Sequence, residues 1–349
     1  MLFGFKLPAR ASTVDIKNLD DLLLLDNALW SFDTSIVTEE RTARRILSIL
    51  LTHRRRARHG GECFSEHCPD CLRPHLDQVV QQVRDGRPVE LSLPAFPAKS
   101  PNRNKVLGPL PDKAEEIAVR FLAGLCDQIS AVYEPGARIT ICADGRVFAD
   151  LIGVPDAHVS AYQRAMARLV AREAPDALRL FTLDDAAAGL CPDQLRRDLD
   201  SRYSESLEQL RAEIRANENT RATYLGIVRF LVEDRLGPDY QGTRSALQRE
   251  SRDRAYGVVA RSRAWGRLVG DRFPHAVRLS IHPQPCGSAK LGILLGGGAD
   301  SWLTPWHSVA VQGGGRFQLM KRAEAERLGA VLVLDRGRPS HFVLTNSCT

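Results

Sequence analysis

The segment RITICADGRVFADLIGV (residues 138–154) places a short β-branched run directly before an Asp-Gly turn. Its first five residues, RITIC, have the composition of a buried strand. A helix is predicted over residues 157–173, and LRLFTL (178–183) is a second candidate strand. Strand, helix and strand in this order predict a parallel pair joined by a helical crossover.

The same alternation extends toward the N-terminus. PVELSL (88–93) predicts another strand, and a loop with five prolines follows it up to Pro111. Asp112 and Glu115 have capping-box spacing and predict a helix that ends near Ser130. A further helix is expected over residues 38–58, with the basic run RRRARH at its C-terminal end.

The pattern divides the chain into four parts. Residues 1–33 are a weakly patterned lead-in, and 34–190 form the α/β part with the substrate loops. Residues 191–275 are helical, with a break near Gly237-Pro238. Residues 276–349 contain short β-like runs at 277–281, 290–295, 307–311, 316–320 and 330–335. We therefore predict an α/β fold with a mainly parallel sheet flanked by helices, a helical insertion and a β-rich C-terminal part that completes the active site.

Composition limits the classes of protein that fit. The chain has 349 residues and a net charge of +6. No apolar run approaches the ~20 residues of a membrane span, and the N-terminus lacks the apolar core of a secretory signal. Basic residues are mixed with acidic ones along the whole chain, which argues against nucleic acid as a partner. We expect a cytoplasmic protein that binds neither membrane nor nucleic acid.

A basic loop follows the first predicted strand. LPAFPAKSPNRNKVLGPLPD (93–112) carries Lys99, Arg103 and Lys105 between a strand and a helix. Ligands of α/β proteins bind at the carboxyl ends of strands, and a helix N-terminus favours anions. The loop is either a rigid cradle for phosphate or carboxylate, or a solvated basic surface loop.

Charged residues also follow the second strand and open a later helix. Asp144 is placed at a strand's carboxyl end, and Arg146 has the geometry to hold an anion through two hydrogen bonds. An ordinary Asp-Gly turn with a surface arginine explains the same residues. Arg244, in YQGTRSALQRESR, is either a second anion clamp or part of a salt-bridged helix surface.

The segment 279–311 is the densest in side chains capable of chemistry. Its imidazoles, ammonium group and indoles form a candidate pocket for a planar substrate and for proton transfer. Each histidine on its own is more easily explained by a structural role. The residues concerned are His282, Lys290, Trp302, Trp306 and His307.

Eight cysteines occur, and three of them fall in ECFSEHCPDCLRPH (62–75). Cys63, Cys68, Cys71 and His75 provide four ligands that suit a tetrahedral structural zinc. Ordinary reduced thiols are an equally acceptable interpretation for a cytosolic chain.

Four of these motifs, in this order, resemble the isocyanide (isonitrile) synthase family, also called pyoverdine/dityrosine biosynthesis proteins, over roughly residues 40–320. They are LPAFPAKSPNRNKVLGPLPDKAE, ICADGRVFADLIGV, YQGTRSALQRESR and RLSIHPQPCGSAKLGI…DSWLTPWHSVAV. The resemblance implies a Rossmann-like fold. It also implies conversion of the α-amine of L-tyrosine or L-tryptophan to an isocyanide, with ribulose 5-phosphate as the one-carbon donor.

The resemblance implies no required cofactor, leaving the structural zinc open, and it implies an iron/2-oxoglutarate oxygenase as pathway partner. We assign catalytic roles to Lys99, Asp144, His282 and His307, which we expect to line one cavity. Lys99 either polarises the ketone or, if burial lowers its pKa, forms an imine with the sugar. Substrate-binding roles go to Arg103, Lys105, Arg146, Arg244, Lys290, Trp302 and Trp306. The alternatives are an enzyme forming an N-formyl amino acid of the dityrosine type, a non-catalytic basic binding protein, and a zinc-dependent scaffold.

Overall fold

A five-stranded parallel sheet forms the centre of the molecule. The computed structural model describes residues 38–55, 63, 67–296 and 303–344. The strands are β1 (Val89–Pro94), β2 (Ala137–Ala143), β3 (Leu178–Thr182), β4 (Val277–Ser280) and β5 (Leu291–Gly292). They lie in the order β3-β2-β1-β4-β5, and every neighbouring pair is parallel. This order is the doubly wound arrangement, so the prediction of a Rossmann-like, mainly parallel sheet is confirmed.

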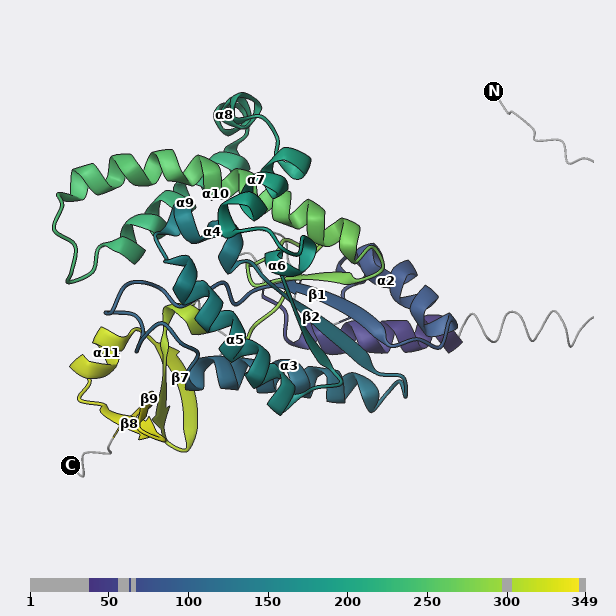
Figure 1. The fold of residues 1–349 in the computed structure, drawn as a ribbon. Helices are drawn as coiled ribbons and strands as arrows, with labels where there is room; N and C mark the ends of the chain where they lie inside the picture. The colour runs from purple at the N-terminus through teal and green to yellow at the C-terminus, as the bar shows by residue number, and fades with distance from the viewer. Residues whose placement is uncertain (1–37, 56–62, 64–66, 297–302, 345–349) are drawn as a thin grey trace, which may run out of the picture.

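Helices cover both faces of this sheet (Figure 1). On one face lie α2 (Pro69–Arg84), α3 (Lys113–Ser130), α5 (Asp156–Glu173) and a helix over 38–52, whose apolar side chains form the largest buried cluster with the strands. On the other face, α10 (Arg244–Arg272) and α7 (Pro192–Tyr203) bury Trp265, Leu268 and Leu199 against Phe181 of β3. The strands are buried on both sides, as their apolar composition predicts.

The helical part consists of α6 (Leu183–Ala186), α7, α8 (Leu207–Ala216), α9 (Glu218–Arg235) and α10. The predicted break near Gly237 separates α9 from α10. With α4 (Gly145–Ile152), the helices α8, α9 and α10 enclose a second buried apolar cluster. No helix among the described residues is long and apolar enough to cross a membrane.

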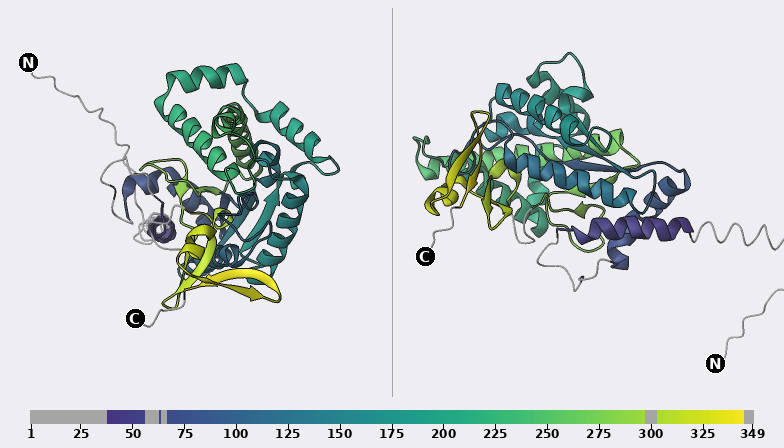
Figure 2. Two further views of the ribbon diagram at one scale, coloured as in Figure 1. Left: turned by 90° about the vertical axis from the view of Figure 1, so that its left-hand side faces the viewer. Right: turned by 90° about the horizontal axis from the view of Figure 1, so that it is seen from below.

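The predicted β-rich part, 276–349, divides between two sheets. Strands β4 and β5 extend the parallel sheet. After η1 (Pro305–His307), the strands β6 (Val309–Gly313), β7 (Arg316–Met320), β8 (Val331–Asp335) and β9 (Arg338–Val343), with α11 (Arg322–Arg327), form a separate mixed sheet in the order β7-β6-β9-β8. This second sheet lies at one end of α3 (Figure 2).

Three predictions about single elements were wrong or incomplete. The first helix ends at residue 52 rather than 58, because the backbone of His53 and Arg55 instead bonds to Leu294 and Gly292. The Asp-Gly-Arg sequence does not form an isolated turn but starts α4. Strand β9 was not predicted as a separate strand.

Candidate active site

The strand order determines where the functional loops meet. Strand β1 lies between β2 and β4. The chain adds β2 and β3 on one side of β1 and then crosses to add β4 and β5 on the other side, so the strand order reverses at β1. Ligands of such sheets bind at the carboxyl ends of the strands, beside this reversal. The loop 95–112, residue 144 and the loop 281–290 follow β1, β2 and β4 and are therefore brought to one edge of the sheet.

Asp144 places its carboxylate at this edge. It occupies the N-cap position of α4, but its side chain makes no capping hydrogen bond. Its Oδ1 is shielded from solvent and has no hydrogen-bond partner among the described residues. Burial raises the pKa of Asp144 to about 7, so near neutral pH this carboxyl group can take up or release a proton.

The backbone beside Asp144 is packed directly against the loop from β1. A Cβ atom placed on Gly145 would lie 1.7 Å from the Pro97 carbonyl oxygen. Only glycine allows this approach, because no real side chain tolerates such a contact. The Asp-Gly pair therefore fixes the carboxylate at the surface of the 95–112 loop.

Lys99 is the centre of a fully buried ion cluster. Its Nζ lies 2.9 Å from Asp112 Oδ2 and 2.8 Å from Glu115 Oε2, and it donates to the Pro305 carbonyl at 3.0 Å. Burial alone would lower the pKa of Lys99, but the two carboxylates outweigh it and raise that pKa. The condition we set for an imine-forming lysine, a lowered pKa, is therefore not met.

Tyr162 extends this cluster and lies within electrostatic reach of Asp144. Its hydroxyl donates to Glu115 Oε1 at 3.2 Å. Burial and the negative charges of Glu115, Asp112 and Asp144 hold the pKa of Tyr162 well above its usual value, so the phenol stays protonated. Burial also raises the pKa of Glu115 to about 7, in spite of the opposing charge of Lys99. Lys99 and Asp144 thus belong to one electrostatic environment.

A second buried carboxylate, Asp234 of α9, joins Lys105 to His307. Lys105 Nζ lies 2.6 Å from Asp234 Oδ1, and His307 Nε2 lies 3.5 Å from Oδ2. The other imidazole nitrogen, Nδ1, is 2.9 Å from the Thr304 hydroxyl. Burial would raise the pKa of Asp234, but His307 and Lys105 lower it well below its usual range. Asp234 therefore remains ionised and orients an imidazole whose side chain is 22% exposed.

Four basic residues gather beside β4, and we call Arg55, Arg278, His282 and Lys290 the basic group. His282 keeps exposed surface as a whole residue, but desolvation of its imidazole by the surrounding protein and the positive charges of Arg55 and Lys290 lower its pKa. Lys290 likewise keeps exposed surface, and desolvation of its ammonium group together with the charge of Arg278 lowers its pKa. Within the parts of the chain that the structure describes, no ion pair joins Arg278, His282 or Lys290 to a carboxylate, so these three members of the basic group favour an anion.

The structure therefore separates the predicted catalytic residues into neighbouring groups. No hydrogen bond or ion pair within the described parts of the chain connects His282 to Lys99 or to Asp144. His282 and Lys290 are exposed in the loop after β4, whereas Lys99 and Lys105 are buried and paired with carboxylates. The two lysines expected to form an anion cradle are thus internal ion-pair partners.

Arg146 is held inside the protein. Its guanidinium donates to Asp156 Oδ1 at 2.8 Å, to Ser160 Oγ at 2.7 Å and to Asp184 Oδ2 at 3.3 Å. Arg196 of α7 binds both carboxylate oxygens of the same Asp156. These contacts join α4, α5 and α7, and they leave Arg146 without a free donor pair for a substrate.

The remaining predicted binding residues differ in position. Arg103 is exposed and lies 3.5 Å from Asp239, a residue of the connection between α9 and α10. Arg244 is the first residue of α10 and is also exposed. Trp306 is buried, and its ring centroid lies 5.2 Å from that of Phe96. Its indole therefore packs against the 95–112 loop. Trp302 lies outside the described residues.

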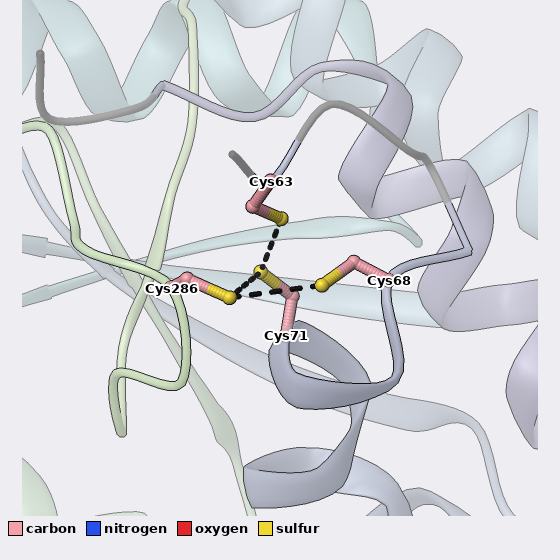
Figure 3. A group of neighbouring side chains, drawn as sticks. All are labelled: Cys63, Cys68, Cys71 and Cys286. Atoms are coloured by element: carbon pink, nitrogen blue, oxygen red, sulfur yellow. Dashed lines mark hydrogen bonds between the residues drawn. The ribbon is translucent and has the colours of Figure 1, made fainter. Parts of the chain in front are cut away.

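The structure brings together three of the four residues that we predicted as zinc ligands, and it adds a fourth cysteine. Cys63, Cys68 and Cys71 meet Cys286, and the four sulfurs lie within 4.8 Å of one another (Figure 3). His75 is not part of this group: it is buried, and its ring donates to the Ser288 carbonyl. Cys286 is separated from the other three by more than 200 residues, so local spacing could not identify it.

Sequence reasoning also missed four acidic or phenolic groups of the site: Asp112, Glu115, Tyr162 and Asp234. Asp112 and Glu115 were recognised only as a capping box, which they do form. Asp234 lies within the ordinary helical sequence LVEDR. A buried lysine needs a carboxylate partner, but the pattern of the sequence does not show which one.

Comparison with known proteins gives four findings. A sequence model of the family described as pyoverdine/dityrosine biosynthesis protein matches residues 79–333. The chain is 46% identical over 316 residues to an L-tyrosine isonitrile synthase of Pseudomonas aeruginosa, covering 88% of this chain and 96% of that protein. It is 42% identical over 311 residues to an L-tryptophan isonitrile synthase of Fischerella ambigua, covering 89% of this chain and 94% of that protein. The crystal structure of the PvcA protein of Pseudomonas aeruginosa superposes with a TM-score of 0.81 at 45% identity, over 87% of this chain and all of that one.

Proposed function

Because the chain belongs to the pyoverdine/dityrosine biosynthesis protein family, we propose that it is an isocyanide synthase acting on an aromatic amino acid, L-tyrosine or L-tryptophan. Its relatives named for these two activities cover nearly the whole chain. We further propose that ribulose 5-phosphate donates the single carbon. The observation that carries the proposal is the half-buried carboxylate of Asp144 at the carboxyl edge of the sheet, whose Oδ1 has no hydrogen-bond partner in the described parts of the chain.

The first chemical requirement is a free amine. An α-ammonium group cannot attack a ketone until it loses a proton. A carboxylate with a pKa near neutrality is a suitable general base, because it is ionised often enough to accept that proton. Asp144, with its pKa raised by burial to about 7, meets this requirement. The free amine then attacks the ketone carbon of the sugar, and loss of water gives an imine.

The sugar phosphate needs cations that are not already neutralised. Lys99 and Lys105 do not provide them, since each is paired with buried carboxylates. Arg278, His282 and Lys290 of the basic group do, since no carboxylate of the described residues pairs with them, and His282 and Lys290 reach solvent. We therefore assign phosphate binding to the basic group. Arg244 is an outer cation on the side of α9 and α10, and Arg103 is a second, because its pair with Asp239 is exposed and therefore weak.

The later proton transfers need a second acid–base residue. His307 is oriented by Asp234 on one side and by Thr304 on the other. We assign it the transfer of protons during breakdown of the sugar skeleton. Lys99 becomes a positioning residue, since its ion cluster connects the 95–112 loop to α3 and to η1.

The experiment is a two-substrate assay. The protein is incubated with L-tyrosine or L-tryptophan and with ribulose 5-phosphate carrying carbon-13 at the ketone carbon, and products are identified by mass spectrometry. The proposal expects the amino acid to lose two hydrogens and gain one labelled carbon. Asp144→Asn should lower turnover by about 10²–10⁴-fold, whereas Asp127→Asn, an exposed aspartate of α3, should leave it unchanged.

Two outcomes contradict the proposal. A labelled formamide present from the earliest time point, without an isocyanide before it, supports the N-formyl alternative. Absence of any labelled product with both amino acids, from a folded protein, removes the activity altogether.

A further inference from the structure

Four cysteine sulfurs converge at the junction between α2 and the loop that follows β4. Cys63 and Cys68 precede α2, Cys71 lies in its first turn, and Cys286 comes from the 281–290 loop (Figure 3). All four sulfurs lie within 4.8 Å of one another. Two segments that are more than 200 residues apart in the sequence therefore present their thiols to a common centre.

The spacing of the sulfurs fits one metal ion. Sγ–Sγ distances are 3.4 Å for Cys63–Cys71, 3.4 Å for Cys71–Cys286 and 3.6 Å for Cys68–Cys286. A tetrahedron with metal–sulfur bonds of about 2.3 Å places its sulfurs about 3.8 Å apart. A disulfide would bring two sulfurs to about 2.05 Å, and a cluster of several irons has its cysteine ligands on different metal atoms.

The surroundings suit bound thiolates. Arg54 Nη1 donates to Cys63 Sγ at 3.1 Å and to Cys71 Sγ at 3.3 Å. Cys68 occupies the N-cap of α2, where the backbone N–H groups and the helix dipole favour negative charge. Four thiolates around a divalent ion carry a net charge of −2, and these donors offset part of it.

We propose that this group of cysteines, here called the four-thiol site, holds one Zn²⁺ through Cys63, Cys68, Cys71 and Cys286. Sulfur-only tetrahedral coordination is typical of zinc in structural sites. Because four protein ligands fill the coordination shell, no position remains for substrate or water. The ion is therefore structural.

Its effect reaches the proposed phosphate site. Cys286 lies between His282 and Lys290 in one loop, and Gly287 next to it has φ +75°, which allows the chain to turn there. Binding Cys286 fixes this loop to the start of α2, more than 200 residues earlier. The zinc thereby positions two members of the basic group; this consequence rests on the proposed function, whereas the metal site itself does not.

The experiment measures metal in the purified full-length protein. Metal content is determined by mass spectrometry of the acid-released ions, and Co²⁺ is exchanged into the site under reducing conditions for absorption spectroscopy. The proposal expects one zinc per chain and the intense charge-transfer and d–d bands of tetrahedral cobalt thiolate. Cys286→Ser should weaken metal affinity by about 100-fold or more, measured against a competing chelator.

Two matched variants separate this site from the rival ligand sets. His75→Gln should retain one zinc and the full cobalt spectrum, since the histidine is outside the four-thiol site. Cys191→Ser, which removes an exposed free thiol elsewhere, should also retain both. If Cys286→Ser does not fold, Cys68→Ser and the wild-type cobalt spectrum test the same set of ligands.

Three results would overturn the proposal. These are protein that neither contains nor binds an equivalent of zinc, iron as the bound metal after growth with both metals, or loss of zinc in His75→Gln together with its retention in Cys286→Ser. None of these readouts depends on catalysis. A protein with one zinc and no isocyanide product would contradict the proposed function and leave the four-thiol site in place.

Discussion

Replacing Lys99 with methionine should destabilise the protein strongly, although the substitution preserves most of the side chain's volume. The lysine side chain is 0% exposed, and those of Asp112 and Glu115 are 3% and 0% exposed. Lys99→Met leaves two carboxyl groups buried without their cation. Removing one partner of a buried ion pair costs about 3–5 kcal/mol.

The assay is urea unfolding, followed by circular dichroism, with the free energy of unfolding extrapolated to water. Lys113→Met is the matched control, because it removes a partly exposed pair with Glu116, and it should cost about 1 kcal/mol or less. Without Lys99 the carboxyl groups bind protons more tightly in the folded state. The loss should therefore be smaller at pH 6 than at pH 8.

A loss in Lys99→Met no larger than that in Lys113→Met would refute this reasoning. The same result, with activity abolished, would return Lys99 to a direct catalytic role. Partial recovery of stability in Lys99→Met/Glu115→Gln would support the electrostatic explanation, since that second change removes one of the stranded charges.

Three further predictions concern the site. Gly145→Ala should lose about 1–3 kcal/mol of stability in thermal unfolding, since the new Cβ meets the Pro97 carbonyl, whereas Gly124→Ala has open space and should not; equal stability of the two would contradict the contact. In the wild type, the folded state keeps Asp144 protonated up to about pH 7, whereas the unfolded state releases this proton near pH 3.8, so the free energy of unfolding of the wild type should fall as pH rises between these values. Asp144→Asn lacks this loss and should therefore gain stability relative to the wild type over the same pH range; parallel stability curves would contradict the raised pKa. Lys290→Gln should raise KM for ribulose 5-phosphate about tenfold and weaken its salt dependence, with KM for the amino acid unchanged; equal changes in both would argue against phosphate binding.

The fold was predictable because its signals are local. The β-branched run at 138–142 and the capping box at Asp112 and Glu115 lie where the strand and helix form. Periodicity could not show that residues 53–55 leave the first helix, because their backbone partners are Gly292 and Leu294.

The site was less predictable, since its chemistry depends on pairs distant in sequence. Residue types and strand ends indicated Lys99, Asp144 and His307. The lysines of the 95–112 loop are neutralised by Glu115 and Asp234, and the sequence around these two carboxylates looks like ordinary helix. Cys286 replaced His75 in the thiol group for the same reason: only the folded loop brings it to α2.

The most direct test of the central claim is the pH dependence of kcat/KM for the amino acid. If Asp144 accepts the proton of the amine, wild-type kcat/KM should rise with pH through about 7, where this carboxyl group ionises. The small residual activity of Asp144→Asn should lack that rise. A wild-type rise at the same pH that persists unchanged in Asp144→Asn would assign the proton transfer to another residue and contradict the account.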